Sequence, residues 1–94
     1  MSERTAPALA ALDALLPALG RLPAGQPREQ ITEEAEALRR AVAAFHMEAI
    51  RFRMHAVDRL LKLAGDPGNT RPLFDAVRQA LEAAGFHTRS HTAP

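Results

Sequence analysis

Apolar residues recur at steps of three and four along most of this chain, a spacing that places them on one face of a helix. Three segments carry the pattern, over residues 6–22, 27–64 and 71–84. Pro17 stands inside the first segment and predicts a kink or an early end there. The pattern therefore predicts an all-α, three-helix chain with a long central helix.

The residues at the ends of these segments are typical of helix boundaries. Pro27 suits the first turn of the central helix, and Thr32 is an alternative cap for its start. Gly65 is placed to end the central helix in a left-handed conformation. Gly85 is placed to end the third helix in the same way, with Phe86 packing back against it.

Two apolar stripes run along the central helix. The first comprises Ile31, Ala35, Leu38, Val42, Phe45, Ala49, Phe52, Ala56 and Leu63. The second comprises Ala43, Met47, Ile50, Met54, Val57, Leu61 and Ala64. Together they make roughly 200° of the helix apolar, whereas a surface helix needs about 100°. A helix with two apolar sides needs neighbours on both, and a second copy of the chain is the simplest supplier. The stripes therefore predict an antiparallel helical-bundle dimer.

The charges of the central helix favour the antiparallel arrangement. Acidic residues crowd its first turns, and basic residues dominate further on. In an antiparallel pair the acidic end of one helix meets the basic end of the other, although the same gradient also complements the helix dipole. The expected dimer interface comprises Leu38, Val42, Phe45, His46, Ala49, Ile50, Phe52, Arg53, Ala56, Val57 and Leu60.

His46 and Arg53 lie seven residues apart, on a line between the two stripes. Burying either side chain without a partner is costly, so each is expected to find one. Three interpretations stay open. The two residues fix the register of the dimer, they reach water through a gap between helices, or His46 is the centre of a site for a small ligand or a metal.

Charge and composition narrow the classes of partner. The chain has 12 basic and 11 acidic side chains and no cysteine, so it lacks the basic excess of most nucleic-acid-binding proteins and the thiolates of metal sites. A nucleic-acid regulator stays open as an alternative, through a face that would carry Arg40, Arg51, His55, Arg59 and Lys62. The apolar runs are too short and too interrupted to span a membrane.

No arrangement of nucleophile, base and orienting residue stands out along the chain, so neither an enzyme nor a cofactor is expected. The sequence predicts a non-enzymatic, self-associating interaction or regulatory module in the cytoplasm, with another protein as an alternative partner. Residues 87–94 are short and polar and predict a disordered tail.

Overall fold

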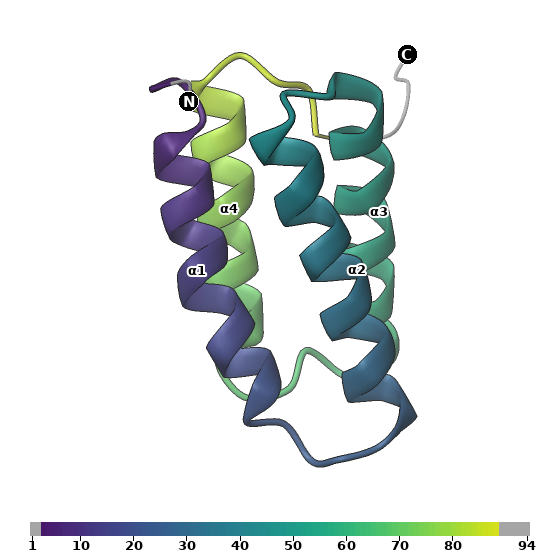
Figure 1. Cartoon of the computed structure of the whole chain (residues 1–94). Helices are drawn as coiled ribbons and strands as arrows, with labels where there is room; N and C mark the ends of the chain where they lie inside the picture. The colour runs from purple at the N-terminus through teal and green to yellow at the C-terminus, as the bar shows by residue number, and fades with distance from the viewer. Residues whose placement is uncertain (1–2, 89–94) are drawn as a thin grey trace.

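Four helices make up the fold of the chain. The computed structural model describes residues 3–88, and the helices are α1 (Ala6–Gly20), α2 (Gln26–Ala43), α3 (Met47–Leu63) and α4 (Thr70–Ala83) (Figure 1). No strand occurs among these residues. The all-α class predicted from the sequence is confirmed. The three-helix chain is wrong, because the central segment forms two helices.

Successive helices run in opposite directions, so the fold is an up-and-down bundle (Figure 1). α1 lies beside both α4 and α2, and α2 lies beside α3. α3 and α4 are also neighbours, but they pack less closely than the other pairs. The turn between α2 and α3 and the end of α4 therefore lie at the same end of the bundle as the start of α1.

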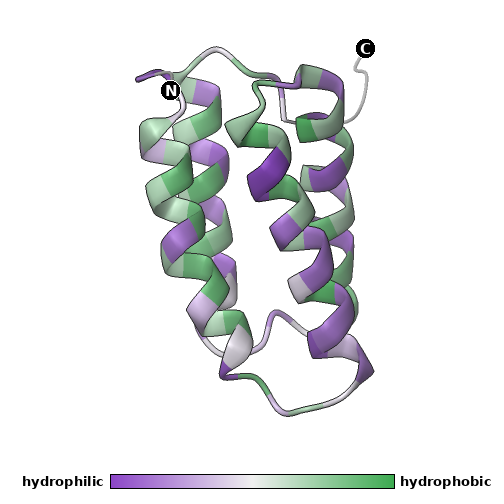
Figure 2. Cartoon of the chain, in the orientation of Figure 1, coloured by the Kyte–Doolittle hydropathy of each residue, from purple (hydrophilic) through white to green (hydrophobic). Residues whose placement is uncertain are grey.

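The core lies where one apolar face of each helix meets the others. Its largest fully buried side chains are Leu12, Leu15, Leu19, Ile31, Leu38, Val42, Ile50, Met54, Leu61, Phe74, Leu81 and Phe86. Hydrophilic residues dominate the first half of α2, whereas α1 is largely apolar (Figure 2). Over residues 3–88, each buried side-chain nitrogen or oxygen has a hydrogen-bond partner, so the interior carries no uncompensated polar atom.

The long central helix expected over 27–64 is wrong, because α2 ends at a tight turn before α3 begins. Phe45 has a positive φ of 59°. Its amide donates to the carbonyl of Val42, and the amide of His46 donates to that of Ala41. These two bonds form a Schellman motif, in which the left-handed residue is usually glycine. A phenylalanine at this position explains why the turn carries no ordinary sequence signal.

His46 starts the next helix at once. Its Nδ1 accepts a hydrogen bond from the amide of Ala49 at 3.3 Å, which is the geometry of an N-terminal cap. Because one helix closes and the next opens within three residues, α2 and α3 pack against each other as an antiparallel hairpin.

The turn also accounts for the two apolar stripes. Along α2 the first stripe is buried, as Leu38 and Val42 show. Along α3 the second stripe is buried, as Ile50 and Met54 show. Each helix thus has one face in the core of a single chain. The argument for a dimer needed both stripes on one continuous helix, and that premise does not hold.

Arginines join neighbouring helices across three of the four seams. The pairs are Arg39–Asp13 between α2 and α1 at 2.8 Å, Arg53–Glu34 between α3 and α2 at 2.9 Å, and Arg71–Asp58 between α4 and α3 at 2.8 Å. Arg39 holds Asp13 through two hydrogen bonds, and this contact lowers the pKa of the Asp13 carboxyl from its ordinary value.

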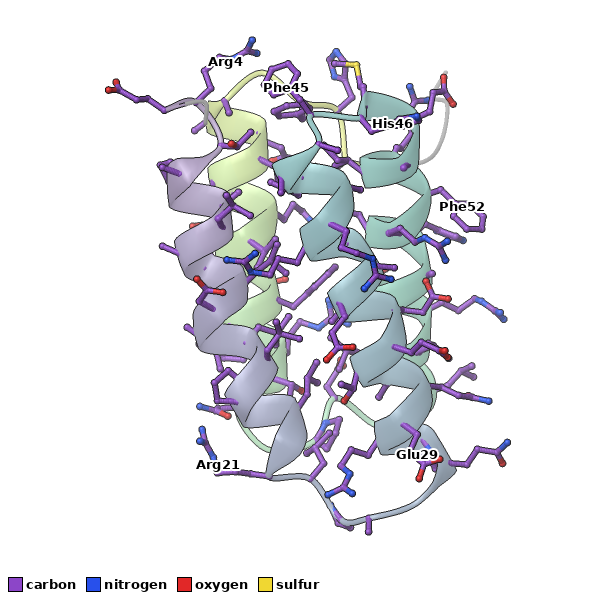
Figure 3. All side chains as sticks on the ribbon, in the orientation of Figure 1. Arg4, Arg21, Glu29, Phe45, His46 and Phe52 are labelled. Carbon is purple, nitrogen blue, oxygen red and sulfur yellow. The ribbon has the colours of Figure 1, made fainter. Side chains whose placement is uncertain are left out.

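Arg4 joins the start of α1 to the end of α4. Its guanidinium donates to the carbonyl of Ala84 and lies 5.3 Å from the ring centre of Phe45 and 5.6 Å from that of Phe86. The two rings meet edge to face, 5.1 Å apart. Figure 3 shows Arg4 and Phe45 together at this end of the bundle. The cluster fastens three chain segments that are far apart in sequence.

The helix ends marked by glycine form as predicted. Gly65 and Gly85 have positive φ values of 83° and 97°, and Phe86 is buried against the bundle. α2 starts at Gln26 with Pro27 in its first turn, rather than at Thr32. α1 continues past Pro17 and ends at Gly20.

None of the helices within residues 3–88 is long and apolar enough to cross a membrane.

The disordered tail expected over 87–94 is wrong at its beginning. Thr88 is buried, and its hydroxyl accepts from Arg78 at 3.1 Å and donates to Glu82 at 3.0 Å. The chain after α4 therefore folds back onto that helix as far as Thr88. The rest of the expected tail, 89–94, lies outside the described residues.

Candidate functional site

The residues expected at a dimer interface do not share one surface. Four of them are buried in the core, namely Leu38, Val42, Ile50 and Val57. Four are partly buried, namely Ala49, Arg53, Ala56 and Leu60. Three are exposed, namely Phe45, His46 and Phe52. The core residues are occupied within the chain, so only the exposed and partly buried members can contact anything else.

His46 and Arg53 each have a partner within the chain. The imidazole of His46 caps α3 at the end of the bundle, where it is exposed rather than enclosed among the helices. Arg53 donates to Glu34 of α2 at 2.9 Å, and its guanidinium lies 5.2 Å from the ring centre of Phe52. The structure does not bring these two residues together in one polar site.

The exposed apolar side chains of the molecule gather at α3. Within residues 3–88, the large hydrophobic side chains that are exposed are Phe45, Met47, Phe52 and Leu63, at 42%, 43%, 63% and 72%. Phe45 lies in the turn before α3, and the other three belong to α3 itself. Figure 3 shows Phe52 pointing away from the bundle. Among the described residues, no other helix presents a large apolar side chain to solvent to this extent.

Phe52 and Leu63 lie on one face of α3, together with the partly buried Ala49 and Ala56. We call these four residues the outer row. The members follow one another at steps of three, four and seven, so they line up along the helix axis. This is the α3 part of the first apolar stripe. Its large members Phe52 and Leu63 lie outside the core, whereas Ala49 packs partly against it. Steps of this kind are typical of a surface that packs against another helix.

A small hollow extends the outer row toward α2. It measures about 140 Å³ and is lined by Pro27, Gln30, Ile31, Leu60, Leu63 and Ala64. All but one of these residues are apolar, and the exception is an uncharged amide. The hollow shares Leu63 with the outer row, so the two form one surface on the α2–α3 hairpin.

Basic side chains border this surface. Arg51, Arg59 and Lys62 are exposed on α3, whereas Glu48 is the exposed acid of that helix. Lys62 lies 3.3 Å from Asp58. Within residues 3–88, no ion pair involves Arg51 or Arg59. His55 lies on the same side, but Arg40, the other member of the expected basic face, belongs to α2.

A second hollow, of about 470 Å³, separates α3 from α4 where these helices pack least closely. Its lining is charged and comprises Asp58, Lys62, Arg71, Asp75, Arg78, Gln79 and Glu82. The sequence analysis did not single out this site, because its members are distant in sequence and balanced in charge.

Ion pairs already occupy the charged groups at one end of this second hollow. Arg71 contacts Asp58 and Asp66 at 2.8 Å and Asp75 at 3.6 Å. Burial raises the pKa of Asp58, but hydrogen bonds from Arg71 and Lys62 outweigh burial and leave the pKa below its ordinary value. Asp58 is therefore ionised and paired at neutral pH, which is typical of a structural link between helices.

Within residues 3–88, no three histidine, aspartate or glutamate side chains lie close enough to hold a metal ion together. The outer row of α3 thus carries the clearest feature that the fold itself does not use. No protein-family model matches the chain, and neither a curated protein nor a solved structure shows significant similarity to it.

Proposed function

We propose that the chain is a non-enzymatic protein-interaction module whose binding surface is the outer row of α3. The observation that carries this proposal is the exposure of Phe52 and Leu63 on one face of a helix whose opposite face is fully buried. Exposed apolar side chains that line up on a rigid element are typical of protein-binding surfaces.

The small size of the chain strengthens the inference. A domain of this length buries only roughly 60–70% of the surface of its unfolded chain, so each apolar side chain in its core contributes a large share of its stability. Burying one large side chain contributes about 1.5–3 kcal/mol. Two such side chains that stay exposed on one helix contribute no burial free energy to folding. Burial against a partner would contribute this free energy to binding.

Site-specific photocrosslinking tests the proposal. A photoreactive phenylalanine analogue is placed at position 52 or at position 63, and the protein is irradiated in its native cells. Matched controls carry the analogue at Ala10 or Ala14, which are exposed on α1. We expect a discrete crosslinked band from both α3 positions and none from the α1 positions. Equal labelling at all four positions, or at none, contradicts the proposal.

The mass of the crosslinked band also identifies the kind of partner. A band at twice the mass of the 10.2 kDa chain supports the self-association predicted from the sequence. Any other discrete mass supports a different protein as the partner. Light scattering of the purified chain across a dilution series provides an independent test of self-association.

A further inference from the structure

The surface around the outer row has a charge pattern that selects among partners. We infer that this surface binds an amphipathic helix of another protein whose apolar side is flanked by acidic residues. The inference rests on the proposed function, because it names the partner of the same surface.

The apolar part of the surface has the dimensions of a helix-binding site. Phe52 and Leu60 are eight residues apart, about 12 Å along the axis of α3. A helix that lies along α3 presents side chains at positions i and i+7 about 10.5 Å apart. One such side chain can contact Phe52 while the next reaches the hollow between Pro27 and Leu63. The partly buried Ala56 lies between them, where its small side chain lets the two helices approach closely.

The charged side chains beside the outer row determine which charge the partner must carry. α3 carries four basic and two acidic side chains. Asp58, one of the two acids, is already held by Arg71 and Lys62. Arg59 lies on one side of the outer row, and Arg53 lies on the other, where Glu34 of α2 already holds it. A carboxylate on the Arg59 side of a bound helix would therefore meet an arginine that forms no ion pair within residues 3–88, in the charge-assisted hydrogen bonds that arginine forms with carboxylates.

A second copy of the chain fits this surface less well. An isologous pair would place the basic border of one α3 against that of the other, and like charges facing each other disfavour association. α2 carries more acidic residues than any other helix, and Glu29, Glu33 and Glu36 are exposed on it. That face presents no large exposed apolar side chain to insert into the hollow. The surface therefore favours a different protein.

Two designed peptides of about five helical turns test the inference by fluorescence anisotropy. Both carry leucines at positions i, i+4, i+7 and i+11, and they differ only in flanking glutamates or flanking lysines. We expect the glutamate peptide to bind at least about tenfold more tightly, which is 1.4 kcal/mol. We expect this preference to shrink as salt is added.

Variants of the protein test whether the preference for the glutamate peptide depends on the basic residues of α3. Arg53→Glu would break the contact with Glu34, so the charge reversal is made at Arg51 and Arg59, which form no ion pair within residues 3–88. The double variant Arg51→Glu/Arg59→Glu should bind the lysine peptide more tightly than the glutamate peptide. Arg21→Glu, far from α3 in Figure 3, is the matched control and should leave the order unchanged. Circular dichroism confirms that each variant is folded.

Three results overturn the inference. The first is equal binding of the two peptides, or binding of neither. The second is tighter binding of a short DNA or RNA duplex than of the glutamate peptide at the same salt, which would assign the basic border to nucleic acid. The third is recruitment to vesicles of phosphatidylcholine and phosphatidylserine. If the inference fails while crosslinking at positions 52 and 63 stays specific, the interaction function stands and only its partner chemistry is wrong.

Discussion

Phe45 holds the backbone of the turn between α2 and α3 in a conformation that most side chains avoid. The same Schellman geometry ends α3 at Gly65 and α4 at Gly85, where glycine adopts the positive φ without steric cost. At Phe45 the aromatic ring compensates, because it packs edge to face against Phe86 and under the guanidinium of Arg4. The contacts of the Phe45 ring thus offset the steric cost of its positive φ, and they close the end of the bundle.

Comparing Phe45→Ala with Phe45→Gly separates these two contributions. Both variants lose the ring, but only alanine keeps the steric conflict of a side chain at positive φ. We expect Phe45→Ala to be about 1 kcal/mol less stable than Phe45→Gly in urea denaturation. At the preceding residue, Ala44, φ is −85°, so Ala44→Gly should not stabilise the protein. Equal stability of the two Phe45 variants would contradict the role of the backbone.

His46 is a second residue that acts through the backbone. Its side chain is an uncommon choice at the start of a helix, where serine, threonine, aspartate and asparagine are preferred. We expect His46→Asp to be about 1 kcal/mol more stable than His46→Ala, because aspartate caps the helix and also interacts with its dipole. Thermal denaturation should show this as a difference of roughly 4–8 °C in Tm. Identical Tm values would show that α3 does not need a cap.

At the scale of the elements, α3 and α4 form the seam that depends most on polar contacts. These helices pack less closely than the other neighbours, and a charged hollow lies between them. Arg71 links the two, since it donates to Asp58 of α3 at 2.8 Å and to Asp66 in the intervening turn. The stability of this seam should therefore depend on pH.

Asp58→Asn tests this link. The pKa of Asp58 is lowered in the folded protein, so its contribution to stability is present above the ordinary pKa of about 3.9 and is lost as pH falls through the folded value. We expect Asp58→Asn to lower the free energy of unfolding by about 1 kcal/mol at pH 7.

The gap between wild type and Asp58→Asn should close as the solution is acidified below about pH 4, which urea denaturation at a series of pH values measures. Asp75→Asn is the matched control, because Asp75 lies farther from Arg71, at 3.6 Å, and is half exposed. It should change stability less at either pH. A gap that is the same at neutral and at acid pH would show that the charge of Asp58 does not matter.

The helices themselves were largely predictable from the sequence, and the break between α2 and α3 was not. The ends at Gly65 and Gly85 follow from a general property of glycine. The end at Phe45 depends on contacts with Arg4 and Phe86, residues that lie about 40 positions away on either side. A pattern within one segment cannot reveal such contacts. The indication that was present is the start of the second apolar stripe at Ala43, two residues before the turn.

The candidate site was predictable in its residues but not in its exposure. Phe52 and Leu63 belong to the first stripe, which the sequence analysis placed against a neighbour. Only the turn at Phe45 shows that this half of the stripe faces outward. The contacts of Arg71 with Asp58 and Asp66 had no signal in the sequence, because these residues come from α4, α3 and the turn between them.

At the scale of the whole molecule, the buried face that stabilises the fold and the proposed binding surface lie on opposite sides of one helix. Ile50, Met54, Val57 and Leu61 of α3 are completely buried, whereas Phe52 and Leu63 are the most exposed large apolar residues among those described. Changes on one face should therefore leave the role of the other intact. A surface that contributed mainly to folding would not separate in this way.

The double variant Phe52→Ser/Leu63→Ser tests this separation. We expect its free energy of unfolding to stay within about 0.5 kcal/mol of wild type, because neither side chain is in the core. Leu61→Ala on the same helix is the matched control and should cost about 2–5 kcal/mol. Urea denaturation provides both values. The double variant should at the same time lose binding to the glutamate peptide. A large loss of stability would instead mean that the outer row supports the fold, and the exposure of its side chains would then no longer argue for a partner.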